Sequence, residues 1–246
     1  MLSRALALTV LIALMALLGP ALLVSRAPVP TPSPQVVLWA WERPVDLRNL
    51  PPGAGVAFLA QTITIVRGSY VVAGRRQPLL VDPSTPIIAV TRIEAPVDAG
   101  APEIAFIARA IADTSQLPRV SGVQIDFDAR ASQRELYRHI LHEVRAALPP
   151  HVPLSMTALV SWCLDDEWLD ELPVDEAIPM LFRMGPSEEA LREEWTRRTP
   201  APKCRGAIGV SLDEPAPAGR KGRRAYVFNP GPWSADTVSA AMETKR

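Results

Sequence analysis

The chain has 246 residues, and its 26 basic and 26 acidic side chains give a formal net charge of zero. This balance excludes the broad basic surface that nucleic-acid binding requires, and basic and aromatic residues are not interleaved. The short basic cluster Arg220–Arg224 lies between apolar stretches and is interpreted as a solvated loop. No nucleic-acid partner is therefore expected.

The N-terminus carries an apolar run from Ala5 to Val24, which follows Arg4 and is interrupted at Gly19–Pro20. The run is close to the length that spans a bilayer, and the small-residue cleavage sites near its end are poor. We expect residues 1–26 to be a signal peptide or an uncleaved membrane anchor, with the anchor slightly favoured. Either one predicts export: periplasmic, anchored in the inner membrane, or secreted.

A proline-rich linker follows at residues 27–35 and predicts an extended spacer. The remaining residues, 36–246, are enough for one hydrophobic core, and no second linker divides them. A single folded domain is therefore expected there.

Eight apolar segments of this domain predict β-strands. They are Val36–Trp41, Gly55–Leu59, Pro86–Ile93, Val120–Asp128, Leu154–Trp162, Ala177–Met184, Gly206–Leu212 and Ala225–Phe228. Helices are expected at Pro102–Leu117, Ser132–Leu148, Asp165–Leu172, from Ser187 onward, and from Ser234 to about Thr244. A short helical turn is expected at Asp46–Leu50. Residues 62–82 show strand-like alternation and two turn signals instead of helical periodicity, so a β-hairpin is expected there.

Strands that mostly alternate with helices predict an α/β fold, and eight of them predict a (β/α)8 TIM barrel. The barrel is expected to be small and partly degenerate, with a β-hairpin insertion after strand 2. An open doubly wound sheet is the alternative, although no glycine-rich phosphate loop follows the first strand.

The fourth predicted strand alternates apolar and polar side chains. Its apolar set is Val123, Ile125 and Phe127, and its polar set is Gln124, Asp126 and Asp128. A barrel strand is covered on both faces, where polar groups are costly unless they serve a site. The alternative interpretation is a structural network in which Arg130 or Arg183 supplies the counter-charge.

A TIM barrel places its active site at the C-terminal ends of its strands. The side chains expected there are Trp41, Glu42, Gln61, Asp126, Asp128, Ser161, Trp162, Phe182, Arg183, Asp213, Asn229 and Trp233. Carboxylates of such a cleft can supply an acid and a stabilising anion, and indole rings suit sugars. Trp39, in mid-strand, is expected in the core, and Glu42 is equally consistent with an exposed turn.

Several of these motifs resemble known families. Gly122-Val-Gln-Ile-Asp-Phe-Asp128 resembles the fourth-strand signature of family 18 glycoside hydrolases, the chitinase-like barrels. Met180-Leu-Phe182 is similar to their Met-x-Tyr motif, and Trp233 resembles the tryptophan at the floor of their sugar site. A closer resemblance, spanning Val36 to Trp233, is to the bacterial domain-of-unknown-function family 3142 of the same clan. It rests on Trp39-Ala-Trp-Glu42, Gln124-Ile-Asp-Phe-Asp128, Ser161-Trp-Cys163 and Pro179-Met-Leu-Phe-Arg-Met-Gly185, and it implies the fold rather than an activity.

The resemblance to the hydrolases implies roles for the fourth-strand residues. Asp128 occupies the position of their catalytic glutamate, and Asp126 that of the residue that orients an acetamido group. Gln124 replaces their first aspartate, and Phe182 replaces a tyrosine, so the substrate-assisted mechanism of the family is in doubt. The expected catalytic residues are Asp128 and Asp126. The expected substrate-binding residues are Gln124, Trp41, Glu42, Trp162, Phe182, Arg183 and Trp233.

Other chemistries have little support in the sequence. His139 and His142 lie three apart on a predicted helix without a third ligand, so a solvated face is expected, with no metal and no other cofactor. Cys163 is placed at the top of the fifth strand and Cys204 below the seventh. Levels about 17–20 Å apart cannot be bridged by a disulfide, so two free thiols are expected.

Three classes of function follow from these patterns. The first is a glycoside hydrolase-like barrel acting on an envelope or extracellular glycan, and the second is a carbohydrate-binding barrel without catalysis. The third is a structural envelope protein that retains only the fold. A glycan is the expected partner, together with a membrane through the N-terminal segment.

Overall fold

A computed structural model of the chain describes residues 33–96, 100–165 and 167–244. The expected targeting segment, residues 1–26, and most of the proline-rich linker lie outside these residues. Within the described ranges, no helix combines the length and apolar character needed to cross a bilayer.

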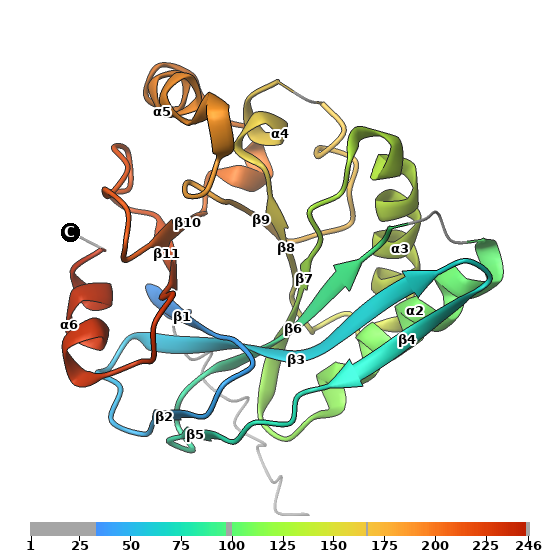
Figure 1. The fold of residues 1–246 in the computed structure, drawn as a ribbon, viewed down its shortest axis with the longest axis horizontal. Helices are drawn as coiled ribbons and strands as arrows, with labels where there is room; N and C mark the ends of the chain where they lie inside the picture. Colours follow the sequence, from blue (N-terminus) through green and yellow to red (C-terminus); the bar gives the residue numbers. More distant parts are fainter. Residues whose placement is uncertain (1–32, 97–99, 166, 245–246) are drawn as a thin grey trace, which may run out of the picture. The chain divides into compact units, whose positions relative to one another are not determined.

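Eight parallel strands form a barrel, seen end-on in Figure 1. They are β1 (Val36–Ala40), β3 (Ala54–Val66), β6 (Ile87–Glu94), β7 (Val120–Asp126), β8 (Leu154–Ala158), β9 (Glu176–Pro179), β10 (Ala207–Ser211) and β11 (Arg224–Phe228). The sheet runs in the order β10-β11-β1-β3-β6-β7-β8-β9. A parallel bridge between Met180 and Gly209 joins its two ends. The predicted TIM barrel is confirmed.

Two apolar clusters hold the barrel, because alternate side chains of each strand point inward and outward. The inward cluster consists of Val37, Trp39, Ala57, Val90, Ile178, Phe182, Ala207 and Tyr226. The larger outward cluster packs strand residues such as Leu38 and Ile125 against the helices. Gln124 and Asp126 are polar exceptions that are also buried, on the strand that the sequence singled out.

The described residues form five α-helices, which lie outside the strands (Figure 1). They are α2 (Ala101–Asp113), α3 (Arg134–Ala147), α4 (Val160–Asp165), α5 (Glu188–Arg197) and α6 (Ala235–Glu243). Helix α3 buries Tyr137 and Ile140 at helical spacing. Ser234 caps α6 as expected, and its hydroxyl oxygen accepts the Thr237 N–H. Ser132 instead lies inside a 3₁₀ turn (Ala131–Gln133) that precedes α3.

The second βα unit contains strands where the other units have a helix. Strand β3 continues beyond its barrel pairing and forms an antiparallel hairpin with β4 (Ser69–Gly74), which confirms the predicted hairpin. Strands β2 (Val45–Leu47) and β5 (Leu79–Val81) form a separate two-stranded sheet. The helical turn expected at Asp46–Leu50 is therefore wrong, because the buried Val45 and Leu47 alternate as in a strand.

Strand β8 is shorter than the sequence suggested. Strand β8 ends at Ala158, and the residues after it form α4, which buries Val160, Trp162, Cys163 and Leu164. The acidic helix expected at Asp165–Leu172 is not formed by the described residues, whose helix α4 ends where it was to begin. Val160, Cys163 and Leu164 have the i, i+3, i+4 spacing of a helix, but the segment is too short for this spacing to be told from a strand.

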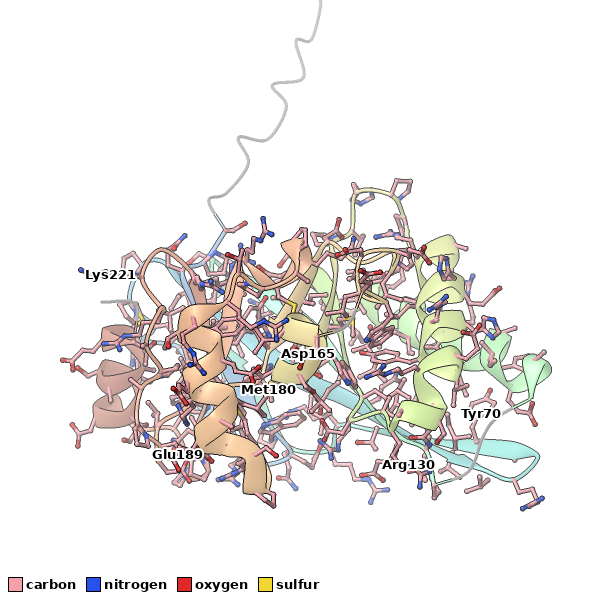
Figure 2. The ribbon with its side chains drawn as sticks, turned by 90° about the horizontal axis from the view of Figure 1, so that it is seen from above. Tyr70, Arg130, Asp165, Met180, Glu189 and Lys221 are labelled. Atoms are coloured by element: carbon pink, nitrogen blue, oxygen red, sulfur yellow. A yellow bond between two sulfur atoms is a disulfide. The ribbon has the colours of Figure 1, made fainter. Side chains whose placement is uncertain are left out.

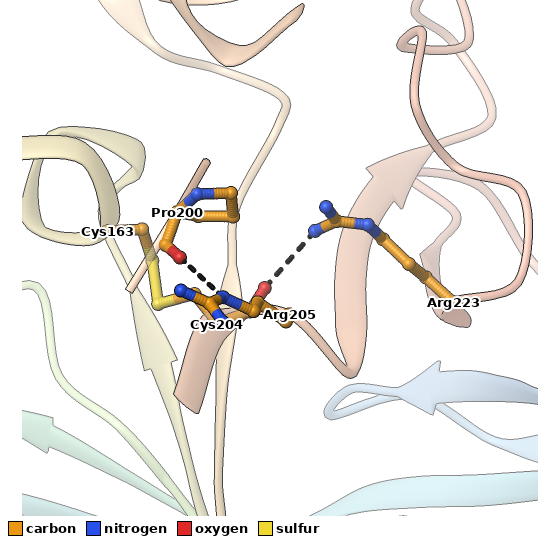
Figure 3. The surroundings of a disulfide bond; sticks show 5 residues. All are labelled: Cys163, Pro200, Cys204, Arg205 and Arg223. Atoms are coloured by element: carbon orange, nitrogen blue, oxygen red, sulfur yellow. Dashed lines mark hydrogen bonds between the residues drawn. A yellow bond between two sulfur atoms is a disulfide. The ribbon is translucent and has the colours of Figure 1, made fainter. Parts of the chain in front are cut away.

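The expectation of two free thiols is also wrong, because Cys163 and Cys204 form a disulfide with their Cα atoms 5.9 Å apart (Figure 3). Cys163 is in α4 rather than at the top of a strand. The segment before β10 lies against that helix, since the Ala201 N–H donates to the Cys163 carbonyl at 2.8 Å. The separation of one strand length therefore does not apply to this pair.

Candidate functional site

A cavity of about 890 Å³ lies at the C-terminal ends of the barrel strands. In Figure 2, Lys221, which precedes β11, lies in the upper half of the barrel, whereas Arg130, which follows β7, lies in the lower half. The strands therefore end toward the lower edge in that view. This is the end of a TIM barrel that carries the active site in characterised enzymes.

The cavity wall combines aromatic rings with charged groups. Its aromatic residues are Trp39, Trp41, Phe182 and Phe228, and its charged residues are Glu42, Arg43, Arg92, Asp126, Asp128 and Arg183. The remaining wall residues include Leu59, Ser161, Met180 and Leu191. Six of the nine residues expected to be catalytic or to bind substrate thus line one cavity, namely Trp41, Glu42, Asp126, Asp128, Phe182 and Arg183.

Asp126 is the buried carboxylate of this cavity, with 4% of the residue exposed. The Arg92 guanidinium donates to its Oδ2 at 2.9 Å, and the Thr157 hydroxyl donates to its Oδ1 at 2.9 Å. Residues 92 and 126 are partners in the parallel register of β6 and β7, which places their side chains together. Each oxygen of Asp126 therefore already accepts one hydrogen bond from the protein.

Burial raises the pKa of the Asp126 carboxyl above its ordinary value, and the charge of Asp128 adds to this effect. The nearby Arg92 opposes the rise, as do the hydrogen bonds from Thr157 and Arg92. The two donors favour the charged form, since a protonated oxygen could not accept from them equally well.

Asp128 differs from Asp126 in its surroundings. It lies two residues beyond Asp126, is exposed, and contributes to the cavity wall. Among the described residues, none donates a hydrogen bond to Asp128 or forms an ion pair with it. Its carboxylate is therefore available to a ligand, whereas Asp126 is held by the barrel.

The aromatic wall is formed by rings from three strands or their ends. Phe182 and Phe228 stack with centroids 5.6 Å apart and planes 7° apart. The rings of Trp41 and Phe228 meet edge to face, with their centroids 6.5 Å apart. The Arg183 guanidinium lies 4.7 Å from the Phe228 centroid and also pairs with Asp213 at 3.3 Å. Apolar ring surface therefore lies next to a charged donor in the cavity wall.

Arg183 has a left-handed backbone with φ 53°, which is unfavourable for a residue with a side chain. The Glu214 carboxylate accepts the Arg183 N–H at 3.0 Å, and the same carboxylate pairs with Arg192 of α5. These contacts from the β10–β11 connection hold Arg183 in place at the cavity wall.

Three residues that were expected to bind substrate do not line the cavity. Gln124 is fully buried; it accepts the Trp39 indole N–H at 2.8 Å and donates to the Ser155 hydroxyl at 3.3 Å. Trp233 donates its indole N–H to the Trp39 carbonyl at 3.0 Å. Gln124 and Trp233 therefore support Trp39, which is buried in the core as expected and also contributes to the cavity wall.

Trp162 is the third of these residues and belongs to the core outside the barrel. It is 3% exposed, and its ring contacts Trp168 and Tyr137 with centroids 5.1 and 6.3 Å away. The expectation that it lies at a strand end failed because α4 begins at Val160. The indole is thereby turned toward α3 instead of the cavity.

Arg92 is a site residue that the sequence reasoning missed. Arg130 and Arg183 were considered as counter-charges for Asp126, but Arg130 donates to the carbonyls of Ala95 and Pro96 instead. The available signal was a lone charged residue, Arg92, within the mostly apolar segment Ile87–Ile93. A cation there, one strand away from the carboxylates, has few acceptors other than those carboxylates.

No cluster of metal-ligating side chains is found in the described part of the chain. His139 is exposed and pairs with Glu135 at 2.9 Å on the outer face of α3. The chemistry available in the cavity is that of carboxylates, guanidinium groups and aromatic rings.

No family model and no curated protein matches the chain. Among solved structures, the chitinase domain of the spore coat protein CotE from Clostridium difficile is similar, with a TM-score of 0.38 and 14% sequence identity. The similarity covers 90% of this chain and 64% of that chain, so this protein spans less than two thirds of its length. The resemblance to family 3142 stays a prediction.

Proposed function

We propose that this barrel binds a glycan in the cavity and hydrolyses it by carboxylate acid–base chemistry. The observation that carries the proposal is the contrast between Asp126 and Asp128. One carboxylate is fixed by two donors, and the other is exposed and unpartnered beside a wall of aromatic rings. Glycoside hydrolysis uses such a pair of carboxylates at the scissile bond.

In this proposal Asp128 donates its proton to the glycosidic oxygen as the carbon–oxygen bond breaks. Asp126 orients the sugar and stabilises the positive charge that develops on it. The sugar carbon then takes oxygen from water, and a carboxylate removes the water proton. Glu42 is the candidate for this last step because it lines the same cavity, whereas Asp213 does not.

Export is part of the same proposal. The apolar N-terminal segment supports it, and so does the Cys163–Cys204 disulfide, since structural disulfides persist mainly in oxidising compartments. The substrate would then be an envelope or extracellular glycan, met by a barrel that is secreted or tethered to the inner membrane. The disulfide is expected to be present in protein isolated from that compartment.

The second candidate is a barrel that binds glycans without hydrolysing them. The exposure of Asp128 favours it, because an acid that protonates a leaving group near neutral pH is usually shielded from water. Both oxygens of Asp126 are also occupied by protein donors. In this case the aromatic wall binds sugar and no bond is broken.

A screen of bacterial-envelope and extracellular polysaccharides separates the two candidates, with binding and release of reducing ends measured on the same samples. The variants are Asp128→Asn and Asp126→Asn, and the control is Asp170→Asn. Asp170 is exposed and does not line the cavity. We expect wild type and the control to bind and hydrolyse one glycan, and Asp128→Asn to bind it with turnover reduced about a hundredfold or more.

Hydrolysis that survives both cavity substitutions would contradict the proposed mechanism. Binding by all four proteins without any turnover would establish the second candidate instead. An absence of binding to every glycan would leave the structural envelope role as the remaining class.

A further inference from the structure

The loop after β1 supplies three consecutive residues of the cavity wall, Trp41, Glu42 and Arg43. It belongs to no helix or strand. Its one internal backbone hydrogen bond joins the Arg43 N–H to the Trp41 carbonyl at 2.8 Å. The position of these side chains must therefore be fixed by other parts of the chain.

Arg75, which directly follows β4, contacts this loop with its guanidinium group. Its Nη1 donates to the carbonyls of Ala40 and Trp41 at 3.1 and 2.7 Å. Its Nη2 donates to the Arg43 carbonyl at 2.7 Å, and its Nε donates to the Gln77 carbonyl at 2.9 Å. One side chain thus joins three carbonyls of the β1 end and loop to the segment after the hairpin.

The loop returns the contact through Glu42. Its Oε1 accepts the backbone N–H groups of Arg76 and Gln77, each at 3.0 Å. Arg75 itself forms no ion pair with a carboxylate of the described residues. Burial lowers the pKa of its guanidinium, and the charge of Glu42 offsets part of this effect. A half-buried cation used to hold carbonyls is costly, which indicates that the loop geometry matters.

The opposite side of the same loop is held by the connection after β11. Arg43 donates to the Pro230 carbonyl at 3.0 Å, and the Trp233 indole N–H donates to the Trp39 carbonyl. The hairpin insertion supplies the matching contact on the β3 side. A standard helix after the second strand would pack on the outside of the barrel and would supply no such contact.

We infer that Arg75 is a positioning residue for the cavity, which holds Trp41 and Glu42 where a ligand meets them. That a ligand binds in the cavity rests on the proposed function. The contacts between Arg75 and the loop do not depend on it. The inference assigns a role to the hairpin insertion that replaces the second helix. The C-terminal end of this insertion orients the loop after β1.

The test measures the quenching of Trp41 fluorescence in the absence of any ligand, so its outcome does not depend on whether the protein binds a glycan. Tryptophan quenching by acrylamide, which is uncharged, is compared for wild type, Arg75→Met, Arg75→Lys and the control Arg76→Met. Arg76 is the exposed neighbour whose backbone N–H alone is used. Each is also measured with Trp41→Phe, and the difference isolates the Trp41 signal from the other five tryptophans.

We expect Arg75→Met to increase quenching of Trp41 about twofold and to leave the quenching measured in the Trp41→Phe background unchanged, because only the loop is released. Arg75→Lys should resemble Arg75→Met, since an ammonium group cannot reach three carbonyls as a planar fork does. Arg76→Met should match wild type. Unchanged Trp41 quenching in Arg75→Met, or an equal rise in the Trp41→Phe background, would overturn the inference.

Discussion

Replacing Arg92 with methionine would leave the Asp126 carboxylate inside the barrel without its cation. The two groups are 2.9 Å apart, and the side chain of Asp126 is 5% exposed whereas that of Arg92 is 40% exposed. Thr157 would remain as the single strong donor to Asp126. Methionine retains most of the apolar stem, so the change chiefly removes the charge.

Breaking a fully buried pair costs about 3–5 kcal/mol. Because Arg92 is partly exposed, water can replace part of its interaction, and we expect a loss of about 2 kcal/mol in the free energy of unfolding near neutral pH. For a domain of this size that loss corresponds to a fall of roughly 4–8 °C in the midpoint of thermal unfolding.

The loss should depend on pH with a definite sign. Burial already raises the pKa of Asp126 above its ordinary value of 3.8, and removal of Arg92 raises it further. A carboxyl that holds its proton more tightly in the folded state makes the fold less stable as pH rises through its folded pKa. The penalty of Arg92→Met should therefore be small near pH 4 and fully present near pH 7.

Thermal unfolding followed by circular dichroism at both pH values tests this reasoning. Arg109→Met is a matched control, because Arg109 also lies 2.9 Å from an aspartate, Asp113, but with both side chains exposed. Its loss should stay below about 0.5 kcal/mol. Adding Asp126→Asn to Arg92→Met should recover most of the stability. An Arg92→Met penalty no larger than that of the control, or equal at both pH values, would refute the argument.

Three further predictions follow from the same structure, one for reduction of the disulfide and two for substitutions. The Cys163–Cys204 bond joins residues 41 positions apart in the sequence, and its reduction should lower the free energy of unfolding by about 4 kcal/mol. The unfolding midpoints with and without dithiothreitol check this loss. Coincident unfolding curves would contradict the prediction. Gln124→Leu should cost about 1–3 kcal/mol in urea unfolding, because the buried Trp39 indole N–H loses its acceptor; a loss under about 0.5 kcal/mol would mean that another acceptor replaces it. Asp128→Asn should change stability by less than about 0.5 kcal/mol, since no described side chain pairs with Asp128, and a larger loss in the same assay would assign it a structural role.

The barrel could be predicted from the sequence because its signals are local. Apolar segments of strand length, separated by amphipathic helices, are repeated often enough that a few misplaced ends do not alter the topology. The alternation in Val120–Asp128 likewise identified the strand that carries the buried carboxylate. In Leu154–Trp162, a short segment that mixes apolar residues with Ser155, Thr157 and Ser161, periodicity could not locate the point where the strand ends and the helix begins.

The errors at the site have the same origin. Trp162 and Cys163 were assigned to the end of a strand, so the indole was expected in the cleft and the thiol far from Cys204. The pair of Arg92 and Asp126 and the contacts of Arg75 depend on register between segments more than 30 residues apart. No local pattern in the sequence specifies that register.

The pairing of β1 with β11 has a consequence for how the protein is made. Val36, Val37 and Leu38 of β1 pair with Ala225, Tyr226 and Val227 of β11, so one edge of the first strand has no partner until nearly the whole chain has been synthesised. An unpaired apolar strand invites wrong pairing with other chains. Ribosome-bound chains of this protein should therefore need a holding chaperone until the last strand is available.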